Sequence, residues 1–198
     1  MARIPKINHD ETQAATRRQL LDAAAVEFAH KGFSAANINA ISRAAGYAKG
    51  TVYNYFPSKL ALMLALIAEA GAAHVQFISE RVRQVGHPAE RLVHFYDAGF
   101  QFVAEHPGQA RFLITTLYSP DTELQAAMYA AYQPLFQLVA QEILFPGITQ
   151  GLFRPADPAA TANLVMTIYL GTGSHVDPQG KPFMDPRQVS DFVLRGLA

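Results

Sequence analysis

The chain contains no cysteine among its 198 residues. This excludes disulfide bonds, thiolate-ligated zinc sites and thiol nucleophiles, and it fits a reducing cytoplasm. The sequence also lacks a run of about 18 uncharged apolar residues, so it predicts no transmembrane helix. Residues 1–10 lack the apolar stretch of a secretory signal. We therefore expect a cytoplasmic protein without a membrane partner.

The formal net charge is zero, but the charges are unevenly distributed. Residues 1–60 carry eight Lys and Arg against four Asp and Glu, a net charge of +4. Residues 61–198 carry 8 basic and 12 acidic side chains, a net charge of −4. A basic N-terminal segment on an acidic body is typical of a local phosphate-binding surface.

The hydrophobic periodicity is helical almost throughout, without the alternation of strands bounded by turns. We therefore predict an all-α fold of about nine helices, with a smaller, basic N-terminal domain over 1–57 and a larger helical domain over 58–198. The first helix begins between Thr12 and Thr16 and ends at Gly32. Prolines, glycines and N-cap residues place the other helices at 38–45, 49–55, 57–84, 88–105, 107–118, 120–144, 158–173 and 186–197.

Two features interrupt this pattern in the second half of the chain. Pro134 falls inside the 120–144 helix and is expected to kink or split it. Pro146-Gly147 is expected to end that helix, and 174–184 is expected to form a loop.

The stretch 37–59, NINAISRAAGYAKGTVYNYFPSK, has the mechanics of a helix-turn-helix. Gly46 permits the positive φ that the turn between two short crossing helices requires, and the small Ser42 lets the helices approach. The joint core is expected to contain the apolar residues Ile41, Ala45, Val52, Phe56, Leu21, Ala24 and Phe28.

That core leaves the start and outer face of the second short helix free to contact DNA. Lys49 and Thr51, beside Gly50, suit phosphates and base edges, and Asn54 suits adenine. The hydroxyl of Tyr53 can donate to a phosphate. Lys59 can anchor a phosphate at a helix N-terminus, and Asn37 can place another helix end against the backbone.

The remaining residues near this face have other expected roles. We assign Phe56 to the core, leave Tyr55 open between core and DNA, and place Arg43 on a solvated face. Arg3 and Lys6 lie on an N-terminal arm that can enter the minor groove.

From Leu20 to Leu62 the sequence resembles the DNA-binding domain of tetracycline-repressor (TetR) family regulators. The resemblance rests on Ala24, Phe28 and Gly32-Phe33, on Ile41 with Ala44-Ala45-Gly46, and above all on the string KGTVYNYF at 49–56 followed by Ser58-Lys59. The segments 151–164 and 193–197 also resemble the family's C-terminal part. The chain departs from the family pattern at Ala36, Tyr47 and Ala48, and Ala48 removes an N-cap hydroxyl.

The resemblance implies a homodimer that binds a double-stranded, palindromic operator and is released by a small-molecule effector, most often as a repressor. It implies pairing through the last two helices, whose apolar faces carry Leu164, Val165, Ile168, Tyr169, Val189, Phe192, Val193 and Leu197. It further implies a protein that is associated with the nucleoid when bound to DNA. The long 57–84 helix is shared by both domains, so its tilt would transmit the conformational change from the bound effector to the DNA-binding helices.

The family keeps its ligand in the helical domain, here among the helices 57–84, 88–105 and 120–144. We expect an apolar or aromatic effector, and a kink at Pro134 can hold its cavity open. Tyr96 is a further polar candidate, and the predicted ligand-binding residues are His74, His94, Phe95, Tyr129, Tyr132 and Phe136.

Two rival functions compete with this interpretation. Glu90, His94 and Asp97 share a helix face at i, i+4 and i+7, as a metal-dependent enzyme could use them, but such a pattern is more often a surface pair with a nearby acid. The sequence has no HExxH, GxSxG, P-loop or GxGxxG motif, so we predict no catalytic residues, no metal and no cofactor. A helical interaction module without DNA would leave 49–59 unexplained.

Overall fold

The computed structural model describes residues 9–155, 157–177 and 182–198. The chain divides into two compact units, one up to Leu66 and one from Ile67 onward. The boundary falls inside α4 (Lys59–Val82). These compact units do not test the functional domains predicted at 1–57 and 58–198, which stay predictions.

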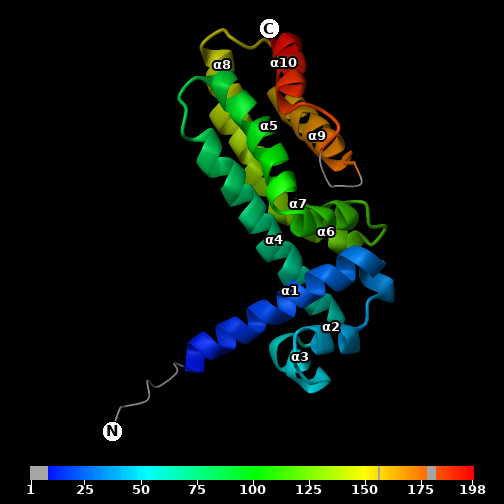
Figure 1. Cartoon of the computed structure of the whole chain (residues 1–198). Helices are drawn as coiled ribbons and strands as arrows, with labels where there is room; N and C mark the ends of the chain where they lie inside the picture. The colour runs from blue at the N-terminus through cyan, green and yellow to red at the C-terminus, as the bar shows by residue number, and fades with distance from the viewer. Residues whose placement is uncertain (1–8, 156, 178–181) are drawn as a thin grey trace. The chain divides into compact units, whose positions relative to one another are not determined.

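The first unit contains α1 (His9–Ala35), α2 (Ile38–Ala44), α3 (Lys49–Tyr55) and the first turns of α4 (Figure 1). Helices were expected at 38–45 and 49–55, and α2 and α3 confirm both. The expected start of α1 between Thr12 and Thr16 is wrong, because Thr16 lies inside the helix and its side chain contacts Tyr47 instead of capping. Gly32 interrupts α1 with φ 70°, as expected of a glycine that ends a helix.

The second unit contains the rest of α4 and the helices that follow it. When the continuous α7, η1 and α8 are counted together, the described residues form nine helices, as predicted. The later elements are α5 (Pro88–Glu105), α6 (Pro107–Leu117), α7 (Thr122–Gln137), the π-helix η1 (Leu138–Leu144), α8 (Phe145–Thr149), α9 (Pro158–Ser174) and α10 (Pro186–Leu197). Within the expected loop 174–184, the described residues include an isolated bridge between Val176 and Pro182.

The start of α7 corrects the expected helix at 120–144. The helix begins at Thr122, two residues later than expected, and Asp121 caps it. The carboxylate of Asp121 accepts hydrogen bonds from the backbone N–H groups of Glu123 and Leu124. Pro134 lies inside α7 without splitting it, and the wider π-helical turns begin at Leu138.

The expected end at Pro146-Gly147 is also wrong, because the helix continues to Thr149. Its end is set by Gly151, which has φ 72° and whose N–H donates to Ile148 at 2.9 Å. The N–H of Leu152 donates to Gly147 at 2.8 Å, which completes a glycine-terminated cap. Gly147 instead seats the ring of Phe153, since a Cβ there would lie 2.0 Å from that ring.

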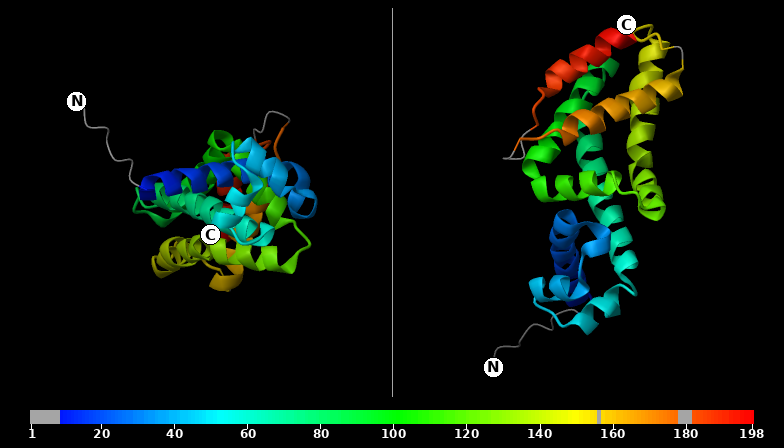
Figure 2. Two further views of the ribbon diagram at one scale, coloured as in Figure 1. Left: turned by 90° about the horizontal axis from the view of Figure 1, so that it is seen from below. Right: turned by 90° about the vertical axis from the view of Figure 1, so that its right-hand side faces the viewer.

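Helix α5 is central to the second unit. It contacts α10, α9 and η1, and Figures 1 and 2 show α10 in red lying alongside α5 in green. Phe95 and Tyr96 of α5 are fully buried in a core shared with Leu135, Ile143 and Val165. Gly99 lets the ring of Tyr169 reach α5, because a Cβ at Gly99 would lie 2.1 Å from Cε2 of that ring.

Helix α4 is long and apolar enough to cross a membrane by length and composition, and it is the one such helix among the described residues. Half of its apolar window is buried inside the chain, where Leu62, Ile67 and Ile78 are core residues.

Candidate nucleic-acid interface and ligand cavity

The first unit forms a small core beneath its two short helices. Leu21, Ala24 and Phe28 of α1 are buried, as are Ile41 of α2 and Val52 and Phe56 near α3. These are the residues that the sequence predicted for the joint core. Ala45 is the exception, since it is half-buried. The core fixes α3 with one face inward and leaves the opposite face to solvent.

The turn between α2 and α3 has the predicted glycine at its bend. Gly46 has φ 80°, and the N–H of Tyr47 donates to the carbonyl of Ser42 at 2.8 Å. Ser42 is buried, so its small side chain permits the close approach of the helices. The turn is therefore hydrogen-bonded to the end of α2.

Tyr47 adds a long-range contact that the sequence analysis missed. Its hydroxyl donates to the side-chain oxygen of Gln19 at 2.5 Å and lies 3.3 Å from the hydroxyl of Thr16. The bond ties Tyr47, two residues before α3, to the middle of α1. A tyrosine where the resembled family has a small aliphatic residue was the available clue to a special contact.

The exposed face of α3 carries the predicted DNA-binding residues. Lys49, Gly50, Tyr53 and Asn54 are exposed, and Thr51 is half-buried. The side chain of Tyr53 is 43% exposed, which leaves its hydroxyl free to meet a phosphate. Tyr55, left open by the sequence, is half-buried.

The two helix starts near this face differ in their caps. The Asn37 side chain caps α2 by accepting from the N–H of Asn39 at 2.8 Å. Ala48 precedes α3 without a side-chain cap, as the sequence indicated. The N–H of Thr51 donates to the carbonyl of Ala48 at 3.0 Å. The N–H groups of Lys49 and Gly50 are left for water or an anion such as a phosphate.

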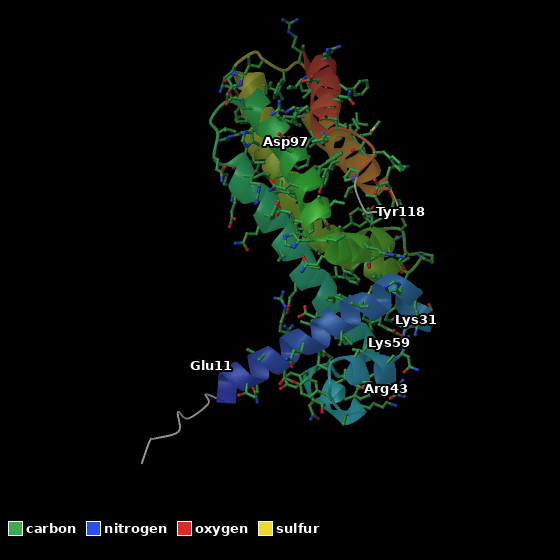
Figure 3. The ribbon with its side chains drawn as sticks, viewed as in Figure 1. Glu11, Lys31, Arg43, Lys59, Asp97 and Tyr118 are labelled. Atoms are coloured by element: carbon green, nitrogen blue, oxygen red, sulfur yellow. The ribbon has the colours of Figure 1, made fainter. Side chains whose placement is uncertain are left out.

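Lys59 is placed differently from its prediction as a phosphate anchor. Its ammonium donates to the carbonyl oxygens of Ser34 at 3.0 Å and Ala36 at 3.3 Å. It also lies 4.9 Å from the centre of the Phe33 ring, a cation–π contact. Figure 3 labels Lys59, and also Arg43, which is exposed on α2. The side chain of Lys59 thus closes the C-terminal end of α1, and Arg3 and Lys6 lie outside the described residues.

The second unit contains a buried polar cluster centred on His74 of α4. The Tyr132 hydroxyl lies 2.7 Å from Nδ1 of His74, and the Tyr169 hydroxyl lies 2.6 Å from Nε2. The imidazole stacks on Phe102 with ring centres 4.1 Å apart. We call His74, Tyr132 and Tyr169 the Tyr-His-Tyr triad.

Burial keeps all three members of the triad neutral. Desolvation lowers the pKa of His74 to about 3, with a smaller contribution from the charge of His106. Burial raises the pKa of Tyr132 and of Tyr169 above the ordinary value of a phenol, and Tyr132 adds to the rise at Tyr169. Uncharged groups in hydrogen-bond contact are what a low-dielectric interior tolerates.

Two cavities lie beside the triad. The larger, which we call the α7–α9 groove, has a volume of about 700 Å³ and opens to solvent. The smaller inner pocket, of about 30 Å³, contacts all three triad members. The α7–α9 groove is lined by Leu117, Gln125, Met128, Tyr129, Ala130, Tyr132, Gln133, Phe136, Asn163, Met166, Thr167 and Leu170.

The structure gathers four of the six predicted ligand residues. Tyr129, Tyr132 and Phe136 line the groove, and His74 lines the inner pocket. The cavity was expected among α4, α5 and α7, whereas the groove lies among α6, α7 and α9. Tyr169 was missed, because its place on an apolar helix face indicated dimer contact.

The other ligand candidates lie elsewhere. Phe95 is fully buried and packs edge-on against Tyr96 and Tyr169. The Tyr96 hydroxyl donates to the carbonyl of Val165 at 3.1 Å inside the core. His94 is half-buried and lines neither the groove nor the inner pocket.

The predicted dimer faces are largely used inside the chain. Val165, Tyr169, Val189, Val193 and Leu197 are buried in the second unit. Leu164 of α9 and Phe192 of α10 remain 61% and 72% exposed, so these two are available to a partner. An amphipathic helix packs its apolar face against the core of its own chain. The sequence analysis had instead assigned the apolar faces of both helices to the partner subunit.

The rival metal site is not assembled among the described residues. Glu90, His94 and Asp97 lie on α5, where Figure 3 labels Asp97, but they form no group of three metal-ligating side chains. The structure therefore adds no support to the metal-dependent alternative.

Comparison with known proteins agrees with the helix-turn-helix. Residues 20–66 match the family described as bacterial regulatory proteins, tetR family. The transcriptional repressor KstR2 of Mycobacterium tuberculosis is 26% identical over 153 residues, 70% of each chain. The transcriptional activator FasR of Mycolicibacterium smegmatis is 30% identical over 131 residues, 64% of this chain and 59% of FasR.

Solved structures extend the fold comparison to both units. The structure of AibR in complex with isovaleryl coenzyme A and operator DNA has a TM-score of 0.74 and 20% identity, and covers 92% of this chain and 97% of AibR. An exposed α3 on a helix-turn-helix core, followed by a helical second unit, defines a DNA-binding transcriptional regulator. The helix-turn-helix over residues 20–66 places the chain among the tetR family of bacterial regulators.

Proposed function

We propose that this chain is a cytoplasmic repressor that binds a palindromic operator as a homodimer and is released by a small apolar or aromatic effector. The observation that carries the DNA-binding part is the exposed face of α3. Lys49, Thr51, Tyr53 and Asn54 are presented there by a helix whose other face is anchored by Val52.

Each of these side chains has a separate role on DNA. Asn54 pairs with an adenine edge and contributes base preference, and Lys49 contacts a phosphate or a guanine edge. Thr51 meets a phosphate or a thymine methyl group, and the hydroxyl of Tyr53 donates to a phosphate. Gly50 and the uncapped start of α3 let the backbone approach a phosphate, and Asn37 places the start of α2 against the next one. Lys59 contributes by holding the end of α1 in place.

Dimerisation follows from the two exposed apolar side chains of α9 and α10. Leu164 and Phe192 bury their surface against a second copy. The two α3 helices of such a dimer reach half-sites about 34–36 Å apart on the duplex. The operator is accordingly a palindrome whose half-sites are one helical turn apart.

The α7–α9 groove is the effector site in this proposal. Its aromatic and apolar lining suits an apolar body, and the acyl-coenzyme A bound by AibR gives a precedent for such a ligand in this fold. Helix α4 carries both Lys59 of the first unit and His74 of the second. A shift of α4 on effector binding therefore couples the two, and a coupling of about 1–3 kcal/mol lowers operator affinity about 5- to 150-fold.

Selection from a random-sequence duplex pool tests the DNA-binding part. The wild-type protein is expected to enrich a palindrome, and Asn54→Ala to relax the base preference at one position in each half-site at a cost of about 1–3 kcal/mol. Arg43→Ala is the matched control, since Arg43 is exposed on α2 and should leave the base preference unchanged. Failure to enrich any consensus would contradict the proposal.

A reporter placed behind the selected palindrome tests the direction of regulation. Repression predicts low expression when the protein is present and recovery in its absence. Higher expression in its presence would make the chain an activator, like its relative FasR, and would overturn the repressor assignment.

A further inference from the structure

The hydrogen atoms of the Tyr-His-Tyr triad do not match its hydrogen bonds. A neutral imidazole carries one N–H and each phenol carries one O–H, so the three side chains bring three polar hydrogens. The triad contains two hydrogen bonds, at 2.7 Å and 2.6 Å, and each uses one hydrogen. One hydroxyl hydrogen is therefore left over, on whichever tyrosine accepts from the imidazole.

The surroundings decide which tyrosine carries the extra hydrogen. Tyr169 is 2% exposed; it borders only the inner pocket of about 30 Å³ and is otherwise enclosed by Phe95, Tyr96 and the backbone of Gly99. Tyr132 is half-buried and lines both the inner pocket and the α7–α9 groove. An unused donor is less costly where water or a ligand can accept it. Tyr169 therefore donates to Nε2, and Nδ1–H donates to the oxygen of Tyr132.

The lining of the groove restricts what that donor can meet. Among the described residues, the groove and the inner pocket are lined by no Lys, Arg, Asp or Glu. The triad itself stays neutral because burial disfavours the charged form of each member. An anionic acceptor would lose water there without gaining a counter-charge, which costs far more free energy than the desolvation of a neutral carbonyl oxygen.

We propose that the hydroxyl of Tyr132 is a preset hydrogen-bond donor that selects effectors with a neutral carbonyl oxygen attached to an apolar or aromatic body. Ketones, esters and thioesters belong to this class, and free carboxylates and plain hydrocarbons do not. The inference rests on the proposed function only in calling the ligand an effector. The donor and its selectivity are properties of the groove.

The tautomer of His74 can be measured without any ligand. Two-bond ¹H–¹⁵N correlation spectra of the full chain labelled with ¹⁵N-histidine distinguish a protonated from an unprotonated ring nitrogen. The set of imidazole signals that is missing from the spectrum of His74→Gln identifies this residue among the seven histidines. We expect a protonated Nδ1 and an unprotonated Nε2. The opposite tautomer would put the extra hydrogen on Tyr169 and overturn the proposal.

The selectivity is measured by titrating the full chain with propiophenone, propylbenzene and 3-phenylpropanoate, followed by chemical-shift changes of the methyl groups of Met128 and Met166 in the groove. The ketone is expected to bind about 3- to 10-fold more tightly than the hydrocarbon, the value of one neutral hydrogen bond, and more tightly than the acid. Tyr132→Phe should remove that preference. Tyr118→Phe is the matched control, since Tyr118 is exposed and lines neither the groove nor the inner pocket, and should keep it.

The outcomes separate this inference from the proposed function. Equal binding of ketone and hydrocarbon to the wild-type protein overturns the inference, whatever the protein does on DNA. So does the absence of binding by either compound in a solution saturated with it. Selective ketone binding that leaves operator affinity unchanged supports the donor role of Tyr132 and instead contradicts the effector role of the groove.

Discussion

The hydroxyl of Tyr47 donates a 2.5 Å hydrogen bond to the side-chain oxygen of Gln19, across 28 residues of sequence. Tyr47 stands two residues before α3, and Gln19 lies in the middle of α1. The bond therefore fixes the direction in which α3 leaves the turn, and with it the placement of Lys49 and Asn54.

Tyr47→Phe should weaken both folding and DNA binding. Removal of the hydroxyl is expected to cost about 0.5–1 kcal/mol of unfolding free energy at this half-exposed position, and to lower operator affinity several-fold. Urea unfolding and fluorescence anisotropy measure the two effects. Gln19→Ala should give the same loss, and the double variant should lose no more than either single one. Additive losses would show that the two side chains act independently.

Lys49 and Lys59 are expected to behave differently although both lie in the same motif. Lys59→Met removes the ammonium from the carbonyls of Ser34 and Ala36 and should destabilise the first unit by about 1–2 kcal/mol. Lys49→Met changes an exposed side chain and should leave stability within about 0.5 kcal/mol. It should instead reduce the slope of log affinity against log salt by about 1. If Lys59→Met instead reduced the salt slope and left stability unchanged, the side chain of Lys59 would be the phosphate contact.

These two lysines show how far the sequence could be interpreted. The positions of α2 and α3, the bend at Gly46 and the core residues Ile41 and Val52 depend on local spacing. They were predicted correctly, apart from the end of α2, which lies one residue earlier than expected. The contacts of Lys59 span 23 and 25 residues, and a lysine at a helix start suits a phosphate as well as a nearby carbonyl. Local pattern does not distinguish these partners.

The same reason explains the partial success in the second unit. His74 and Tyr132 were identified because polar groups in an apolar, aromatic segment are unusual. Tyr169 lies 95 residues from His74, so no local pattern joins them. Gly99 in the interior of α5 was the available clue, because a glycine there weakens the helix unless something large packs against it.

Gly99→Ala should be strongly destabilising. The new Cβ would lie 2.1 Å from the Tyr169 ring, so the ring must move and the triad with it. Overpacking of this kind costs about 1–3 kcal/mol. Gly108→Ala is the control, since a Cβ at Gly108 meets nothing within 4 Å. Differential scanning calorimetry should show a lower Tm for Gly99→Ala alone. Equal Tm values would mean that Tyr169 has room to move freely.

Burial of neutral His74 makes stability depend on pH in a defined direction. Its pKa falls to about 3 in the folded chain, below the ordinary value of about 6.5 that the unfolded chain recovers. Between these values the unfolded state binds more protons, so stability falls as the pH is lowered below 6.5. From pH 7 to pH 5 the loss from His74 is about 2 kcal/mol.

Urea unfolding of the wild-type protein and of His74→Gln across that pH range isolates this contribution. The variant is expected to be less stable at pH 7 and to show a shallower decline toward pH 5. Parallel declines would mean that His74 is protonated in the folded chain as readily as in the unfolded one, contrary to its buried, neutral state.

The central claim is that the exposed face of α3 reads one palindromic DNA sequence. It is tested most directly by anisotropy titration of the wild-type protein with the selected palindrome and with a scrambled duplex of equal composition, from 50 to 200 mM salt. We expect preference for the palindrome at every salt concentration. Its affinity should fall by about 10³–10⁵ over the series, as 6–10 phosphate contacts require. Equal affinity for both duplexes would contradict the claim.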